Sequence, residues 1–174
     1  MLKDIEIARK LGADGVVFGC LTADGEVDLT SMQILMEASK GLSVTFHRAF
    51  DVCRNPQKAL EEIIELGCNR ILTSGQQPTA EQGIGLLKEL QGLAAGRITL
   101  LAGCGVNENN IARIAAGTGI NEFHFSARES IQSEMKFRNE VVSMGGTVHI
   151  NEYERNVTSV RRVKETVEAL YKGM

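Results

Sequence analysis

The sequence predicts an α/β protein of the TIM-type (β/α)8 barrel family, present as an incomplete barrel with about five parallel βα units. Short apolar runs start at residues 15, 43, 70, 97 and 122, so a strand-sized segment recurs at a nearly constant spacing. Segments long enough for an amphipathic helix separate these runs. Such an alternation of strand and helix requires parallel strands that are joined by crossover connections.

Polar and apolar residues alternate within the strands, and this pattern separates a barrel from an open doubly wound sheet. In residues 122–127, Phe123 and Phe125 alternate with polar residues, and residues 44–48 follow the same pattern. An open sheet covered on both faces would carry two apolar sets. One apolar set and one mixed polar set fit a barrel, whose upper interior meets a ligand.

The helices are predicted in order from their end signals. The chain opens on a helix with Leu2, Ile5, Ala8 and Leu11 on one face, and no strand precedes it. Glycines that end a helix recur just before the strands, as in Leu66-Gly67-Cys68-Asn69. The remaining helix starts are marked by Asn55-Pro56, by a capping box at Thr79-Ala80-Glu81-Gln82 and by Asn107.

The C-terminal part gives weaker signals. We predict a helix over Glu134 to Ser143, a Gly145-Gly146 turn and a short extended piece. A last helix, roughly Thr158 to Tyr171, carries an apolar stripe of Val160, Val163, Val167 and Leu170.

We take residues 1–174 as a single domain. Five strands do not close an eight-stranded barrel, so two interpretations of this domain are open. One is a small open α/β domain. The other is a barrel without its first three βα units, and the opening helix favours it. In either case the unpaired strand edges predict a homo-oligomer.

Composition excludes several classes of partner. The chain has 174 residues, 43% of them apolar, which suffices for a sizeable core. A formal charge of -3, without long runs of one sign, gives no electrostatic reason to expect nucleic acid or an anionic membrane. The apolar runs are only strand-length and the first ten residues are charged, so we expect neither a transmembrane helix nor a signal peptide, and we predict a cytoplasmic protein.

Two histidine–arginine pairs lie near strand ends. His47 and His124 point to the same side of their strands, and Arg48 and Arg128 follow them. The carboxyl ends of parallel strands carry the ligand site in α/β folds. Together these groups suit a small anionic ligand, with forked hydrogen bonds from arginine. The alternative is that each histidine is a core residue and that Arg48 pairs only with Asp51.

Two further strand ends add candidates for the same rim. Gly103-Cys104-Gly105 forms a glycine-rich turn before a capped helix, where a backbone can approach an anion, unless it is a plain tight turn. Ser126 precedes Arg128 at the last strand, and Ser74 with Gly75 follows the third strand.

The four cysteines are scattered without a CxxC pair, which fits reduced thiols. Cys20 and Cys104 follow strands and reach the rim, so they are the candidate metal ligands. Soft thiolates suit Cu(I), and a Cys/His mixture also suits zinc. Cys53 and Cys68 flank a helix and are interpreted as packing residues.

Six segments resemble the CutC copper homeostasis family in order and spacing over essentially the whole chain: DGVVFGCLTADGEVD, VTFHRAFD, RILTSGQ, the glycine loop, EFHFSAR and MKFRN. The resemblance implies a TIM-type barrel, a role in copper tolerance or trafficking, and Cu(I) binding in some members. It implies a cytoplasmic protein, with the nucleus as a second compartment, and no established reaction. The positions that match the family's motifs are His47, Arg48, Asp51, Ser74, Gly75, His124, Ser126 and Arg128.

The sequence departs from the family pattern in two places. The family usually has three glycines where this chain has Gly103-Cys104-Gly105. Full-length members begin with about three further βα units, which include cysteine-bearing strands proposed for copper.

Three hypotheses remain. The first is a non-catalytic Cu(I)-handling protein. The second is an enzyme or sensor for a small phosphorylated or carboxylate metabolite bound at the rim. The third is a truncated isoform whose open sheet is stable only when it pairs with another chain.

Overall fold

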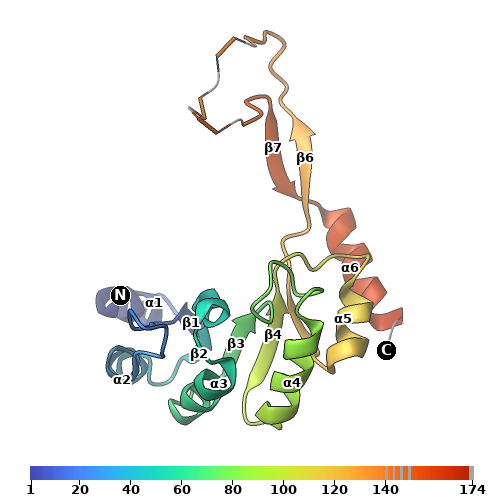
Figure 1. Cartoon of the computed structure of the whole chain (residues 1–174). Coiled ribbons are helices and arrows are strands. Elements are labelled where there is room, and N and C mark those ends of the chain that lie inside the picture. Colours follow the sequence, from blue (N-terminus) through green and yellow to red (C-terminus); the bar gives the residue numbers. More distant parts are fainter. Residues whose placement is uncertain (140, 143, 146, 149, 173–174) are drawn as a thin grey trace.

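A computed structural model describes residues 1–139, 141–142, 144–145, 147–148 and 150–172. Helices and strands alternate through the first five strands, and a two-stranded hairpin and a final helix follow (Figure 1). In chain order the elements are α1 (Leu2–Lys10), β1 (Gly15–Phe18), α2 (Leu29–Ala38), β2 (Ser43–Phe46), the 3-10 helix η1 (Arg48–Val52), α3 (Pro56–Glu65), β3 (Arg70–Thr73), α4 (Ile84–Ala94), β4 (Thr99–Gly103), α5 (Ile111–Thr118), β5 (Glu122–His124), β6 (Arg128–Gln132), β7 (Glu154–Thr158) and α6 (Val160–Lys172).

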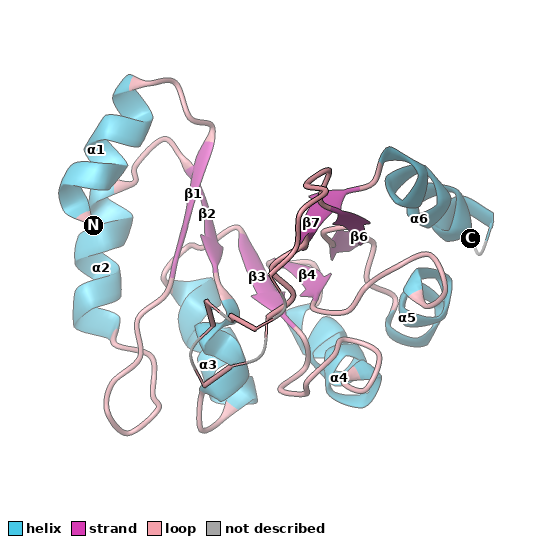
Figure 2. Ribbon diagram, turned by 90° about the horizontal axis from the view of Figure 1, so that it is seen from above, coloured by secondary structure: helices cyan, strands magenta, loops and turns pink. Residues whose placement is uncertain are grey.

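The main sheet has five parallel strands in the order β1-β2-β3-β4-β5, so each strand pairs with the next one in the sequence. Helices α1 to α5 lie in an arc along the outer side of this sheet (Figure 2). The predicted parallel βα architecture of an incomplete barrel is confirmed.

The two faces of the sheet differ in burial because the helices cover only one of them. Phe46, Ile71 and Leu100 are in register on the outer face, and each is almost completely buried. Val17 and Thr45 are in register on the inner face, and Val17 is 62% exposed there. This uncovered inner face is the side that a closed barrel would enclose.

The amino end of the inner face is polar. Arg70 at the start of β3 donates to Glu122 at the start of β5, with Nε 2.7 Å from Oε2, and the Arg70 guanidinium also reaches the Ser43 hydroxyl. The ion pair spans β4, and together with the Ser43 contact it links β2, β3 and β5 where they begin.

The helix-end signals predicted from the sequence are confirmed at several joints. Gly67 and Gly119 follow α3 and α5 with φ of +83° and +76°, the left-handed conformation that ends a helix. Asn55 caps α3, since its side chain accepts the Lys58 amide at 3.0 Å. The cap of α5, however, is Asn110, and Asn107 forms the preceding turn instead.

The predicted helix over Glu134 to Ser143 is wrong for the residues that the structure describes. Residues 134–139 are non-helical and belong to the connection between β6 and β7, which form an antiparallel hairpin that projects from the body (Figure 1). Charged and apolar residues alternate from Glu134 to Arg138, and this period of two favours extended backbone. Of the predicted turn, Gly145 lies in a turn, while Gly146 and Ser143 fall outside the described residues.

The final helix is confirmed, but its buried stripe differs from the prediction. Val160 and Val167 are 85% and 40% exposed, whereas Thr166 is fully buried. Helix α6 packs against α5 through the stripe that includes Thr166 and Leu170. Val160 and Val167 were misassigned because the buried side of α6 is centred on Thr166, whereas the predicted Val163 and Leu170 are half-buried.

Among the described residues, no helix combines the length and apolar character that a membrane crossing requires.

Candidate functional site

The carboxyl ends of β2, β3 and β4 meet at one rim of the sheet, and each continues into a polar segment. Strand β2 leads through His47 into η1, β3 into Ser74 and Gly75, and β4 into the glycine-rich loop. Several residues predicted for the site therefore lie at the same edge.

Asp51 is the centre of a hydrogen-bond network at this rim. Its side chain is only 7% exposed. Oδ1 accepts the Thr73 hydroxyl at 2.5 Å, the Ser74 amide at 3.0 Å and the Gln76 amide at 3.2 Å. These donors come from the end of β3, so Asp51 ties η1 to that strand. Its carboxylate oxygens accept hydrogen bonds from the protein itself.

Arg48 completes the network from the solvent side. Its Nε donates to Asp51 Oδ2 at 2.6 Å, and its Nη2 donates to the Ser74 hydroxyl at 2.9 Å. The Asp51 hydrogen bond is the main cause that raises the pKa of Arg48, and the nearby Cys104 thiol adds a smaller effect. The predicted pairing of Arg48 with Asp51 is therefore present, but the Arg48 side chain is still 43% exposed.

Glycines set the position of Ser74. Gly75 has a φ of +70°, and a Cβ there would lie 2.6 Å from the carbonyl oxygen of Gly83. A Cβ on Gly83 would in turn overlap the carbonyl oxygen of Ser74. The turn after β3 consequently contacts the start of α4 backbone to backbone, and only glycine fits at both positions.

The glycine-rich loop is held by its own polar groups. The Cys104 thiol donates to the Pro78 carbonyl at 3.0 Å, and the Cys104 carbonyl accepts the Ala80 amide at 3.0 Å. Cys104 has a φ of +79°, which is rare for a residue with a side chain. The Gly105 carbonyl accepts the Asn110 side-chain amide at 2.9 Å. The loop therefore has a defined shape and places a thiol beside the rim.

The two histidines differ in their roles. His47 Nδ1 accepts the Ala49 amide at 3.2 Å, so this imidazole caps η1. His124 is exposed on β5, in register with Gly103 of β4. Over the described ranges the two imidazoles share no hydrogen bond with each other. His124 thus offers an open side chain at the rim, whereas His47 has a structural contact.

Ser126 lies between β5 and the hairpin, Arg128 is the first residue of β6, and both side chains are exposed. The backbone of Arg128 is fixed, because Arg162 donates to its carbonyl oxygen. Arg162 also donates to both carboxylate oxygens of Glu108, at 3.0 and 3.1 Å. This bidentate pair joins α6 to the segment before α5 and anchors the base of the hairpin.

The cysteines are all free thiols. Cys20 and Cys104 are partly exposed, while Cys53 and Cys68 are buried. Burial, and to a smaller extent Asp28, raises the pKa of Cys20. In the part of the chain that the structure describes, no three His, Cys, Asp or Glu side chains are grouped as metal ligands.

Sequence reasoning missed two of the donors to Asp51. Thr73 and Gln76 donate to Asp51, and the Gln76 side-chain amide also reaches the Cys53 carbonyl at 2.7 Å. The motif RILTSGQ contains both donors, so its run of hydroxyl and amide groups was the available signal. Chemically, the rim offers arginine and imidazole donors for an oxyanion and partly exposed thiols for a soft metal ion.

The chain resembles known proteins over nearly its whole length. The CutC family model matches residues 1–129. A Bacteroides thetaiotaomicron protein named "family protein CutC" is 77% identical over 170 residues, which are 98% of this chain and 68% of that protein.

Solved structures extend this comparison. A "Putative Copper Homeostasis Protein CutC" from Streptococcus agalactiae is 32% identical, with a TM-score of 0.68 over 71% of this chain. This chain spans only 60% of that structure. A structure titled "Native KDPGal structure", 13% identical with a TM-score of 0.58, shares the fold alone.

Proposed function

Because this chain belongs to the CutC family, we propose that it acts in copper homeostasis in the cytoplasm by binding Cu(I) through cysteine thiolates, without catalysing a reaction. The single observation that supports this proposal is that all four cysteines are free thiols. Cu(I) prefers soft sulfur ligands over carboxylates and carbonyls. The partly exposed Cys20 and Cys104 are the thiols that solvent copper reaches first.

The test is an anaerobic titration of the reduced chain with Cu(I) against a chromophoric Cu(I) chelator. We expect stoichiometric binding that competes with the chelator. The double variant Cys20→Ser/Cys104→Ser shows whether Cys20 and Cys104, the rim thiols, are the Cu(I) ligands. If the chelator keeps all of the copper in the presence of the unmodified chain, the proposal is wrong.

A second candidate function is the binding of a small phosphorylated or carboxylate metabolite at the rim. The observation that favours it is the 43% exposure of the Arg48 side chain beside Ser74. His124 and Arg128 are exposed near the same edge. Arginine binds such anions by paired hydrogen bonds.

A thermal-shift series with phosphate and citrate tests this candidate. We expect an increase in melting temperature that Arg48→Ala and Arg128→Ala reduce. Arg155→Ala is the matched control, because Arg155 is an exposed arginine on β7. Equal responses of all three variants, or no response of the unmodified chain, would contradict the rim site.

A further inference from the structure

A thiol and a thioether lie side by side at the end of the sheet opposite the rim. Cys68 is in the turn between α3 and β3, and its thiol donates a hydrogen bond to the Sδ of Met36 on α2, with the two sulfurs 3.7 Å apart. The two residues are 32 positions apart in the sequence, so the fold brings them together. Cys68 is only 5% exposed.

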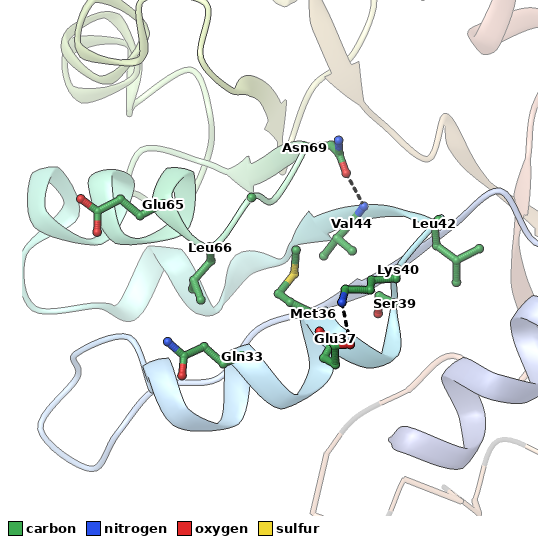
Figure 3. A pocket seen from close by; sticks show the side chains of 12 residues that line it. Gln33, Met36, Glu37, Ser39, Lys40, Leu42, Val44, Glu65, Leu66 and Asn69 are labelled. Atoms are coloured by element: carbon green, nitrogen blue, oxygen red, sulfur yellow. Dashed lines mark hydrogen bonds and ion pairs between the residues drawn. The ribbon is translucent and has the colours of Figure 1, made fainter.

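Met36 connects this pair to solvent. It lines a surface pocket of about 550 Å³ between the ends of α2 and α3 (Figure 3). In Figure 3 the Met36 side chain rises from α2 toward the strand that carries Val44. The carboxylates of Glu37 and Glu65 also line the pocket, and that of Glu37 pairs with Lys40 at 2.7 Å. Lys40 also lines the pocket and neutralises Glu37, so among the lining side chains Met36 is the soft donor that an entering metal ion can contact.

The distance between the two sulfurs suits a shared metal ion. A metal–thiolate bond is about 2.3 Å long, so two sulfurs on one ion lie at most about 4.6 Å apart. The observed 3.7 Å is below this limit, so one ion can contact both sulfurs in a bent arrangement. Thiolate and thioether are also the ligand types that select Cu(I).

We propose that Met36 and Cys68 form a Cu(I)-binding site, which the pocket between α2 and α3 connects to solvent. This proposal rests on the proposed function, because it names where the copper binds. On binding, the Cys68 thiol releases its proton to water, the thiolate and the Met36 thioether each give a lone pair to the ion, and copper remains Cu(I).

Burial raises the pKa of the Cys68 thiol to about 11, so the empty site holds a proton at neutral pH. Metal binding at such a thiol must displace that proton. Cys53 is also buried, but its sulfur is near the Gln76 amide, at 3.5 Å. Cys53 is as buried as Cys68 but contacts an amide and not a thioether, so it is a matched control for Cys68.

The test compares Met36→Leu with Met32→Leu in the Cu(I) titration described above. Both methionines are on α2, Met32 is fully buried, and leucine keeps the volume of the side chain. We expect Met36→Leu to weaken Cu(I) binding at least tenfold and Met32→Leu to leave it unchanged. Cys68→Ala should weaken binding at least a hundredfold, while Cys53→Ala should not. Copper-edge X-ray absorption should count one sulfur fewer on Cu(I) in Met36→Leu.

The outcomes separate the site from the function. If the unmodified chain binds Cu(I) but Met36→Leu and Met32→Leu bind equally well with the same number of sulfur ligands, the site is wrong and copper binding stands. If binding is lost only in Cys20→Ser/Cys104→Ser, the rim thiols are the site. Failure of the unmodified chain to bind Cu(I) overturns both proposals.

Discussion

Asp51 shows how one carboxylate shapes the rim. It accepts hydrogen bonds from Thr73, Ser74 and Gln76, while Arg48 balances its charge. The sequence placed Asp51 at the rim, and in the structure its carboxylate accepts hydrogen bonds from the protein itself. Those donors are 22 or more residues away, and no local pattern encodes such distant contacts.

Replacement of Asp51 by asparagine tests this role. We expect Asp51→Asn to lower the free energy of unfolding by about 2 to 3 kcal/mol, because buried donors lose an acceptor and Arg48 loses its counter-charge. Urea unfolding measures the change. Asp24→Asn is the control, since the side chain of Asp24 is 83% exposed. A loss as small as that of the control would contradict a structural role for Asp51.

The buried thiol of Cys68 makes stability depend on pH. Its pKa is raised from 9.0 to about 11 by burial, so the folded state keeps a proton that the unfolded state releases between these values. The contribution of this thiol to the free energy of unfolding is fully present below pH 9 and is lost as the pH rises to 11. We expect the unmodified chain to lose about 2 to 3 kcal/mol more than Cys68→Ala over that interval. Parallel pH profiles of the two proteins in urea unfolding would refute this.

At the scale of the elements, α4 depends on glycine at its start but not in its interior. A Cβ on Gly83 would overlap the Ser74 carbonyl, whereas a Cβ on Gly92 meets no atom within 4 Å. We expect Gly83→Ala to destabilise the protein by about 2 to 3 kcal/mol, because the backbones must separate. Gly92→Ala should stabilise it by about 0.5 to 1 kcal/mol through helix propensity. Chemical denaturation of both variants checks the opposite signs.

The elements also show what sequence patterns predict and what they miss. The five βα units were predictable because caps and helix-ending glycines, such as Asn55 and Gly67, are local signals. The β6–β7 hairpin was missed because its strands are polar and its partner residues, such as Arg128 and Thr158, are far apart in the sequence. The Met36–Cys68 pair was missed for the same reason, and Cys68 was interpreted as packing alone.

At the scale of the whole molecule, the uncovered inner face and the β1 edge should determine how copies of the chain associate. Val17 on β1 is 62% exposed. Strand edges with exposed apolar residues pair readily with other chains, and a lysine on the edge opposes that pairing. We therefore expect the chain to form a homo-oligomer that Val17→Lys converts to a monomer.

Light scattering coupled to size-exclusion chromatography measures the mass. Val52→Lys is the control, because Val52 is 75% exposed but lies in η1, away from the sheet edge. A cooperative, well-behaved monomer of the unmodified chain would show that the open edge needs no partner.

The sequential strand order has a consequence for how the sheet opens. Every strand of the main sheet pairs only with its neighbours in the sequence, so each pairing closes a short stretch of chain. Such nearest-neighbour connectivity favours stepwise fraying from the two ends of the sheet. Strand β3, at the centre and tied to η1 by Asp51, is then the last to exchange its amide hydrogens, and β1 and β5 are the first.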